Sequence, residues 1–383
     1  MSTNENIRDA YPDFALLVDG KNAFPEIIKC IECAKRSIYI NMFIWRDDEI
    51  GNRVGRAVLT AADNGAEVYI SVDRYGVVLE KAEESKKSFF HKEQTLIEKI
   101  KTRSLEIAYP MENAPKKAKD EITELYKSII SHPRITVSRD VFKADHSKYY
   151  IIDDEILFLG GINIEDKENG ADMQGRVYGD YMAKLCGAKY VDVFREKLKS
   201  GRDTGNGYFF GVNLKDGKKR NFEMEEKYLD MINSAERELH ITMAYFSPLP
   251  KFIDAIVAAH RRGVAVTLMI PERANFQNDT NRKTVRKLMK LTNNGITVLL
   301  SPRMLHTKMV INEKIVSFGS TNITKKAFGQ LSELNLFVNN VDSKFNKDLF
   351  ADVEKNYKMS KKINNYKEIK YNRPLAFFEG FLV

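Results

Sequence analysis

Short apolar runs alternate with amphipathic helical patterns along the chain, and the same series occurs twice. Residues 34–45 read AKRSIYINMFIW and residues 235–246 read AERELHITMAYF, so that in both a charged helix end precedes β-branched and aromatic residues. A helical pattern follows each run, ends in glycine at Gly65 or Gly263, and leads into another apolar strand. Glycine after a helix, followed by a β-branched run, is typical of an α-to-β connection. The pattern therefore predicts a strand, a helix and a strand in each half.

Each half continues with two more apolar strands and a final helix, so strands and helices alternate throughout. Such alternation predicts an α/β fold with helices on the faces of a sheet. Because the series is repeated, we expect two pseudosymmetric α/β/α sandwich halves packed together, with one site between them. The length of 383 residues suffices for two domains, which we place at residues 1–200 and 201–383. The polar, Gly-containing residues 200–220 predict a linker between them.

The halves differ between residues 77 and 133. Here the first half has a long helical stretch rich in Lys and Glu, with breaks at Pro110 and Pro115, whereas the second half has only residues 273–294. The nearly balanced charge of this insert favours a solvated surface. A role as a lid, or in shaping the substrate site, is the alternative.

The net charge of +8, from 61 Lys and Arg against 53 Asp and Glu, favours an anionic partner. Phosphate, nucleic acid and an anionic membrane surface all remain open on this ground. The first 13 residues are polar and predict no signal peptide. No apolar run approaches the ~18–20 residues that cross a bilayer. We expect a cytoplasmic protein, soluble or attached to a membrane only at its surface.

Three cysteines, Cys30, Cys33 and Cys186, are too few and too unevenly spaced for a disulfide framework, and they fit a reducing compartment. Cys30 and Cys33 have CxxC spacing, but they lie inside an amphipathic helical pattern rather than at a helix start after a strand. Core packing is therefore favoured over redox or metal chemistry.

The strongest chemical signal is a repeated pattern, His-x-Lys-x4-acid, followed by a strand and a Gly-containing turn that ends in Asn. The matched residues are His146, Lys148, Asp153 and Asn163 in the first half, and His306, Lys308, Glu313 and Asn322 in the second. The Asn follows the His by 17 residues in the first copy and by 16 in the second. The other histidines, His91, His132, His240 and His260, have no such context, and we expect them to be surface or core residues.

Strand alternation places His and Lys of each motif on one face, with the acid on the opposite face or beyond the strand end. Ammonium and carboxamide groups from both halves can neutralise the oxygens of one phosphoryl group. Two histidines can divide the chemistry: one attacks phosphorus, and the other donates a proton to the leaving oxygen and later accepts one. The ordinary histidine pKa of ~6.5 suits both states, and no metal or cofactor is required.

At these motifs the chain resembles the phospholipase D superfamily, whose signature is the duplicated His-x-Lys-x4-Asp followed by Gly-Gly/Ser-x-Asn. The resemblance extends from about Phe14 to Lys355. Residues 43–51 (FIWRDDEIG) and the turn at residues 245–248 (YFSP) are similar to segments of the cardiolipin synthase branch. The second motif departs from the signature because it ends in Glu313 rather than Asp.

This resemblance implies a transphosphatidylase that moves a phosphatidyl group from a phospholipid to a histidine and then to an alcohol, such as phosphatidylglycerol. It implies that His146 is the nucleophile and His306 the acid and base. It also implies that an acid from each half faces the other half's histidine. Asp180 and Glu333, which follow their own motif histidines by 34 and 27 residues, are the candidates. With both motifs in one chain, a monomer is expected to be active.

Two questions stay open from the sequence alone. The lysines, tyrosines and final apolar residues of 355–383 either dock on an anionic membrane or pack on the second half. The substrate is expected to be phosphatidylglycerol or a similar phospholipid, and the alternative is a phosphodiesterase or nuclease acting on nucleic acid. A binding scaffold without activity is disfavoured because both His/Lys/Asn sets are complete.

Overall fold

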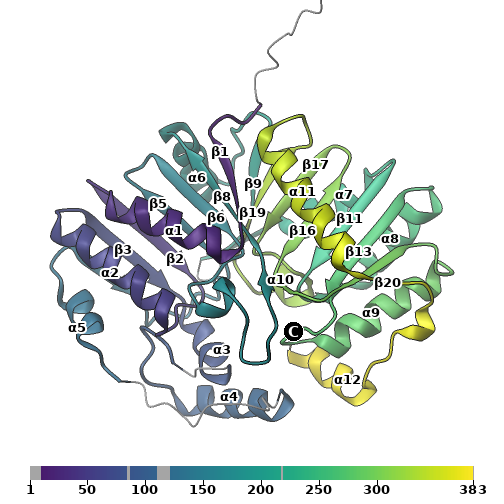
Figure 1. Ribbon diagram of the computed structural model, residues 1–383, viewed down its shortest axis with the longest axis horizontal. Helices are drawn as coiled ribbons and strands as arrows, with labels where there is room; N and C mark the ends of the chain where they lie inside the picture. Colours follow the sequence, from purple (N-terminus) through teal and green to yellow (C-terminus); the bar gives the residue numbers. More distant parts are fainter. Residues whose placement is uncertain (1–9, 84–86, 110–120, 217–218, 383) are drawn as a thin grey trace, which may run out of the picture.

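The computed structural model describes residues 10–83, 87–109, 121–216 and 219–382, and in these the chain forms two large mixed sheets, one in each half (Figure 1). The first sheet has the order β1-β8-β6-β5-β2-β3-β4. Its strands are β1 (Phe14–Val18), β2 (Ser37–Met42), β3 (Glu67–Val72), β4 (Ile135–Ser138), β5 (Tyr149–Ile152), β6 (Ile156–Gly160) and β8 (Tyr181–Cys186).

The second sheet has the order β10-β9-β19-β17-β16-β11-β13-β14-β20. Its strands are β9 (Tyr208–Asp216), β10 (Lys219–Phe222), β11 (Glu238–Met243), β13 (Ala265–Pro271), β14 (Thr297–Ser301), β16 (Lys308–Asn312), β17 (Ile315–Gly319), β19 (Glu333–Asn339) and β20 (Lys361–Ile363). The run β8-β6-β5-β2-β3-β4 matches the run β19-β17-β16-β11-β13-β14 strand for strand. The predicted pseudosymmetric α/β repeat is therefore confirmed.

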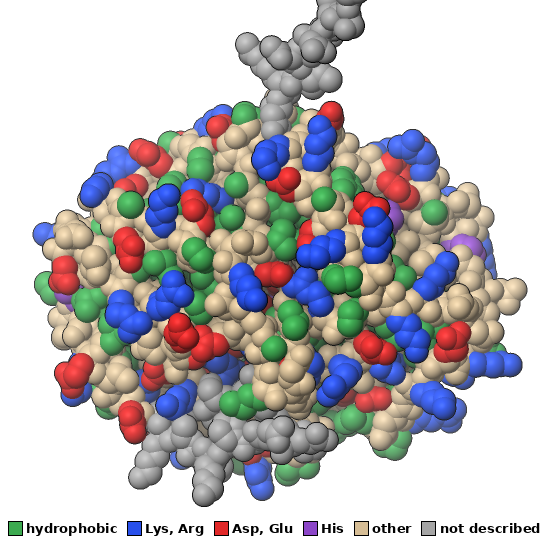
Figure 2. Space-filling view, viewed as in Figure 1, with side chains coloured by type: hydrophobic (Ala, Val, Ile, Leu, Met, Phe, Trp, Pro, Cys, Tyr) green, Lys and Arg blue, Asp and Glu red, His purple; other side chains and the backbone are tan. Residues whose placement is uncertain are grey.

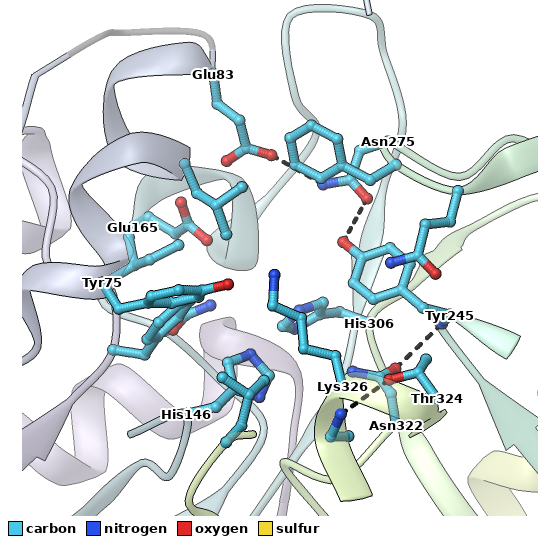
Figure 3. A pocket seen from close by; sticks show the side chains of 18 of the residues that line it. Tyr75, Glu83, His146, Glu165, Tyr245, Asn275, His306, Asn322, Thr324 and Lys326 are labelled. Carbon is cyan, nitrogen blue, oxygen red and sulfur yellow. Dashed lines mark hydrogen bonds between the residues drawn. The ribbon is translucent and has the colours of Figure 1, made fainter. Parts of the chain in front are cut away.

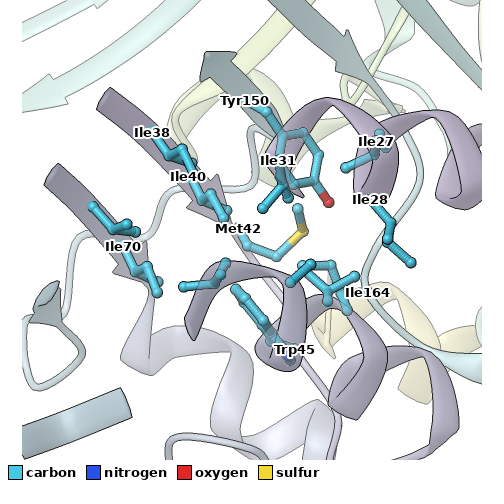
Figure 4. Close-up of a cluster of buried hydrophobic side chains, with 14 of the residues drawn as sticks. Ile27, Ile28, Ile31, Ile38, Ile40, Met42, Trp45, Ile70, Tyr150 and Ile164 are labelled. Carbon is cyan, nitrogen blue, oxygen red and sulfur yellow. The ribbon is translucent and has the colours of Figure 1, made fainter. Parts of the chain in front are cut away.

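The outer face of each sheet packs against helices. In the first half, α1 (Asp19–Glu32) and α2 (Glu49–Asp63) cover β2 and β3, and Figure 4 shows the cluster of isoleucines around Trp45 between them. Ile38 and Ile40 alternate along β2 toward this cluster, as a half-buried strand requires. In the second half α7 (Met224–Asn233), α8 (Pro250–Arg261) and α9 (Asn278–Leu291) have the same role.

The inner faces of the two sheets meet in a third apolar cluster. Leu157 and Leu159 of β6 reach this cluster from the first half, and Leu334 and Leu336 of β19 reach it from the second. Helices α6 (Ala188–Ser200) and α11 (Lys344–Met359) pack against the same cluster. The central strands are buried on both faces, which explains why they read as continuous apolar runs in the sequence.

The predicted linker at residues 200–220 is only partly correct. Residues 201–207 connect the halves, but β9 and β10 form an antiparallel hairpin at the edge of the second sheet. Tyr208, Phe210 and Val212 alternate toward the central cluster, and this burial makes the segment a strand. Gly217, inside the predicted linker, lies outside the described residues.

The insert is helical, as predicted, and contains α3 (Val77–Ala82), α4 (Leu96–Ala108) and α5 (Glu124–Ser131). The expected breaks at Pro110 and Pro115 lie outside the described residues. The C-terminal segment is largely part of the second half, since β20 pairs with β14 and α12 (Arg373–Leu382) packs on α9. The side chains of Phe381 and Leu382 are not among those described.

Cys30 is buried in α1, as core packing predicts, whereas Cys33 at the helix end is exposed. Within the described ranges, no helix is both long and apolar enough to span a bilayer.

Candidate active site

Two short parallel bridges between the halves position the motif histidines. Asp145 pairs with Ser332, and the backbone N–H of His146 donates to the Ser332 carbonyl at 2.8 Å. In the other half, β15 (Met304–Leu305) pairs with β7 (Tyr178–Gly179), and the N–H of His306 donates to the Gly179 carbonyl at 2.8 Å. Each histidine is thus bonded to the residue that immediately precedes an acid of the opposite half.

This register brings Glu333 to His146. The Nδ1 atom of His146 lies 3.1 Å from Oε2 and 3.2 Å from Oε1 of Glu333. The Ser320 hydroxyl donates to the same carboxylate from the Gly-Ser turn of the second motif. Because Nδ1 contacts the acid, Nε2 is the ring nitrogen left for a substrate.

His306 has two carboxylates instead of one. Its Nδ1 atom lies 3.0 Å from Oδ2 of Asp180 and 3.2 Å from Oε1 of Glu168. Gly161, which occupies the position of Ser320 in the first motif, makes room for Asp180, because a Cβ atom there would lie 2.1 Å from the carboxylate. The two sites thus differ in both the number of acids and the turn residue behind them.

The motif lysines lie behind the histidines and are fully buried. Nζ of Lys148 donates to the His146 carbonyl at 2.5 Å, and Nζ of Lys308 donates to the His306 carbonyl. Burial and the neighbouring Lys308 ammonium lower the pKa of Lys148 to about 7, and burial also lowers the pKa of Lys308. Two ammonium groups that repel one another in a dry site attract an anion, and a bound phosphate would favour the charged form of both.

The protonation of the two histidines is shifted in opposite directions. Burial, together with Lys148 and Lys308, lowers the pKa of His146 well below its usual value. Burial and Lys308 also lower the pKa of His306, but the Glu168 and Asp180 carboxylates outweigh them, and its pKa is raised. Burial raises the pKa of Glu333 to about 8, although Lys148, Lys308 and the Ser320 hydroxyl act in the opposite direction. These shifts favour the neutral imidazole at His146 and the imidazolium at His306.

Both histidines point into one cavity of about 150 Å³ (Figure 3). Of the ten residues predicted for the site, five line it: His146, Asn163, His306, Asn322 and Glu333. Lys148, Lys308 and Asp180 lie directly behind them. The rest of the lining is mostly apolar and aromatic, and includes Phe43, Leu79, Leu105, Tyr109, Phe276 and Leu331.

One wall of the cavity joins the two halves through polar contacts. Nδ2 of Asn275, from the second half, donates to Glu83, from the first half, at 2.9 Å, and the Tyr245 hydroxyl donates to Oδ1 of Asn275 at 2.8 Å. Glu83 also forms ion pairs with Arg46 and Lys167. These contacts link the two halves at the edge of the site.

Asp153 and Glu313, the acids that end the two motifs, do not reach the cavity. Asp153 accepts hydrogen bonds from the backbone N–H groups of residues 35, 36 and 37, and Glu313 accepts them from those of residues 236, 237 and 238. Both carboxylates thus hold the start of a neighbouring strand at the end of the sheet remote from the histidines. Glu313, one methylene longer than Asp, makes the equivalent contacts, so both acids hold backbone and lie apart from the eight other residues predicted for the site.

Glu168 and Ser320 are site residues that the motif search did not find. Glu168 follows Asn163 by five residues, and Ala327 holds the same offset after Asn322. Comparing the two repeats for an acid present in only one would have found Glu168. Ser320 is part of the Gly-Ser turn of the second motif. Its role comes from its hydrogen bond to Glu333, which the sequence alone does not reveal. In the described part of the chain, no cluster of His, Cys, Asp and Glu side chains is arranged to hold a metal ion.

Comparison with known proteins supports the resemblance to the phospholipase D superfamily. Residues 27–174 and 228–357, well over half of the chain, match the family described as "Cardiolipin synthase, PLD-like domain". The chain is 24% identical to cardiolipin synthase B of Shigella flexneri, over 87% of this chain and 78% of that protein. It is 25% identical to a cardiolipin synthase of Clostridium perfringens, over 88% of this chain and 70% of that protein.

The fold is also similar to that of a solved structure, the phosphatidylserine synthase of Haemophilus influenzae. The TM-score is 0.66 at 14% identity, over 96% of this chain and 91% of that one. At this identity the likeness concerns the fold alone. Together with the family match and the two facing motifs, it leads to one conclusion: the chain belongs to the phospholipase D superfamily, in the cardiolipin synthase-like group of phosphatidyltransferases.

Proposed function

We propose that this phospholipid-synthesising enzyme transfers a phosphatidyl group through a phosphohistidine intermediate to an alcohol acceptor, and that it makes cardiolipin from two molecules of phosphatidylglycerol. The observation that carries the proposal is the pair of facing histidines. Each contacts a carboxylate of the opposite half, and their pKa values are shifted in opposite directions in front of two buried lysines.

In the first step, Nε2 of the neutral His146 attacks phosphorus. A P–N bond forms and the P–O bond to the leaving alcohol breaks, while the protonated Nε2 of His306 gives its proton to that oxygen. Glu333 holds Nδ1 of His146 and stabilises the positive charge that develops on the ring. Glu168 and Asp180 keep His306 protonated until this moment.

In the second step, the hydroxyl group of the acceptor gives its proton to Nε2 of His306, and its oxygen attacks the phosphorus atom. The P–N bond breaks and His146 is regenerated. Asn163 and Asn322 line the cavity where the phosphoryl oxygens would lie, and Lys148 and Lys308 act on the same oxygens through the low-dielectric interior.

The surroundings of the cavity favour a lipid over a nucleic acid. The cavity lining includes Leu79, Leu105 and Phe276, whereas a groove for nucleic acid would present repeated basic side chains along the path of the nucleic-acid backbone. On the face shown in Figure 2, basic and acidic side chains are interspersed and form no continuous basic groove. A cavity of about 150 Å³ accommodates a phosphate and its headgroup, so acyl chains would lie outside it. We therefore place the working protein, as a monomer, at an anionic membrane surface.

The test is turnover of phosphatidylglycerol by the purified protein, followed by mass spectrometry of the lipids. Cardiolipin and free glycerol should appear in equal amounts without added metal. The matched control is His146→Ala. It removes the nucleophile and keeps the backbone hydrogen bonds that residue 146 forms with Ser332 and Lys148. A folded wild-type protein that neither forms cardiolipin nor exchanges any phospholipid headgroup would refute the proposal, and metal-free cleavage of DNA abolished in His146→Ala would replace it with the nuclease alternative.

A further inference from the structure

Helix α4 of the insert has its apolar side facing outward. Leu96, Ile97, Ile100 and Ile107 are between 60% and 75% exposed, and they lie within about 100° of arc on the helix. The buried side chains of α4 are the polar Glu98 and Thr102. An ordinary surface helix has the reverse arrangement, so this outward face is suited to an apolar surrounding.

Polar contacts attach the inner side of α4 to the protein. Glu98 forms a two-point ion pair with Arg74, at 3.0 Å for both contacts. The Thr95–Glu98 capping box closes the start of the helix, and Gln94 donates to the Thr102 hydroxyl at 2.8 Å. The helix is therefore fixed without using its isoleucines, which remain available to another surface.

The same helix borders the active site. Leu105 of α4 and the following Tyr109 line the cavity of the histidines. They also line an adjoining hollow of about 280 Å³, whose opposite side includes Leu375 of α12. Figure 1 shows α4 and α12 along the same edge of the molecule. On α12, Phe377 is 66% and Phe378 is 41% exposed. Exposed apolar side chains thus stand on both sides of the way out of the active site.

The charges on this edge fit an anionic surface. Exposed Lys99, Lys101 and Arg103 accompany the isoleucines of α4. Its two acids, Glu98 and Glu106, form ion pairs with Arg74 and Arg103. A helix with an outward apolar face flanked by lysines is typical of segments that lie in the interface of an anionic bilayer.

We propose that the outward face of α4, with Phe377 and Phe378 of α12, docks the protein on an anionic phospholipid bilayer and brings the mouth of the active site against the headgroups. The proposal rests on the phospholipid substrate inferred above. The cavity holds the phosphate, while the acyl chains stay in the bilayer that α4 and α12 contact. From the tail expected to bind membrane, the exposed aromatic residues among the described side chains are Phe377 and Phe378, and α4 of the insert supplies most of the surface.

The test is a comparison of the triple variant I97S/I100S/I107S with the control Val341→Ser. Val341 is 42% exposed and follows β19, which begins at the site with Glu333 and runs away from it for about 20 Å. Leu96 is left unchanged because it opens the capped first turn of α4. All three substituted side chains are exposed, so the thermal midpoint and circular dichroism should equal those of the wild type.

Each protein is first sedimented with vesicles of phosphatidylglycerol or of phosphatidylcholine, in a His146→Ala background so that no turnover occurs. The wild-type surface and the Val341→Ser control should bind phosphatidylglycerol vesicles, and the triple variant should bind at least about tenfold more weakly. Equal binding by the triple variant, or no binding by the wild-type surface, would overturn the proposal. So would a dimer in solution that the triple variant dissociates while vesicle binding is unchanged, because α4 would then be a contact between copies.

Activity is then measured in proteins that keep His146. The triple variant should lose about tenfold in turnover on vesicles, yet stay within about twofold of the wild type on short-chain phosphatidylglycerol dissolved as monomers. Equal losses on both substrates would assign α4 to the active site and overturn docking. Inactivity of the wild type on every phospholipid, together with vesicle binding that depends on α4, would instead refute the proposed function and leave the docking surface standing.

Discussion

His146 and His306 are held by equivalent backbone contacts but by different carboxylates. Each histidine N–H donates to the carbonyl before the other half's acid, at 2.8 Å in both cases. His146 then has Glu333 alone, whereas His306 has Asp180 and Glu168. The equivalent backbone hydrogen bonds join the two halves into one site. The different number of carboxylates beside each ring shifts the pKa values of the two histidines in opposite directions. A symmetric scaffold can thus carry an asymmetric reaction.

Removing each histidine in turn should have the largest effect and should separate their two roles. His146→Ala and His306→Ala should both lower lipid transfer by about 10⁴-fold or more. They should differ with a p-nitrophenyl phosphodiester, whose leaving group needs no proton. His306→Ala should still release a stoichiometric burst of nitrophenol, measured by stopped-flow absorbance, and His146→Ala should release none. A burst from His146→Ala alone would reverse the two roles.

Neutralising the acids should produce the next largest effect. Glu333→Gln and Asp180→Asn keep the shape of each contact but remove the ionisable carboxyl that orients the ring and can stabilise its positive charge, so kcat should fall by about 10²-fold or more in each. Both proteins should keep the wild-type thermal midpoint, as a melting curve would show. A loss below about threefold in either variant would show that its contact does not support catalysis.

Glu168, which comes from the first half, contacts His306 and has no counterpart beside His146, so its removal should shift the pH profile. His306 must be protonated to act as an acid, and Glu168 together with Asp180 raises its pKa. Without Glu168 that pKa falls, so the alkaline limb of kcat/KM should move to lower pH, while the acidic limb stays in place. Glu168→Gln should show this displacement with a loss of about tenfold at the wild-type optimum. A uniform loss with an unmoved limb would mean that Glu168 only supports packing.

The acids that end the motifs should have the smallest effect on chemistry. Glu313→Asp should leave turnover within about twofold, because Asp153 already performs the same backbone contacts in the first half. Glu313→Ala and Asp153→Ala each remove the acceptor for several N–H groups and should lower the free energy of unfolding by about 1–3 kcal/mol, measured by urea denaturation. A large loss of kcat with unchanged stability would show that these acids take part in catalysis.

Much of this arrangement could be predicted from the sequence. Apolar periodicity and the repeated motifs predicted the two α/β halves, because strands buried on both faces and helices with one apolar side leave distinct patterns. The spacing of Asp180 and Glu333 from their own histidines, together with the resemblance, suggested which acids would face which rings. Their contacts nevertheless depend on a register between halves that no local pattern records.

Other features depended on burial and could not be predicted. The hairpin at β9 and β10 looked like a linker because glycines and charges surround Tyr208, Phe210 and Val212, and only packing on the other half makes it a strand. The bonds of Lys148 and Lys308 to the carbonyls of the motif histidines were likewise not predicted. The apolar face of α4 was hidden in the sequence by its interleaved lysines, since a charged composition favours a solvated surface.

The most direct test of the division between the two halves is to trap the phosphoenzyme. The wild-type protein is mixed with phosphatidylglycerol carrying labelled phosphate, quenched by denaturation at alkaline pH, digested and mapped by mass spectrometry. We expect a base-stable phosphoramidate on His146, and its accumulation in His306→Ala with an activated substrate. Label on His306, or on neither histidine during active turnover, would contradict it.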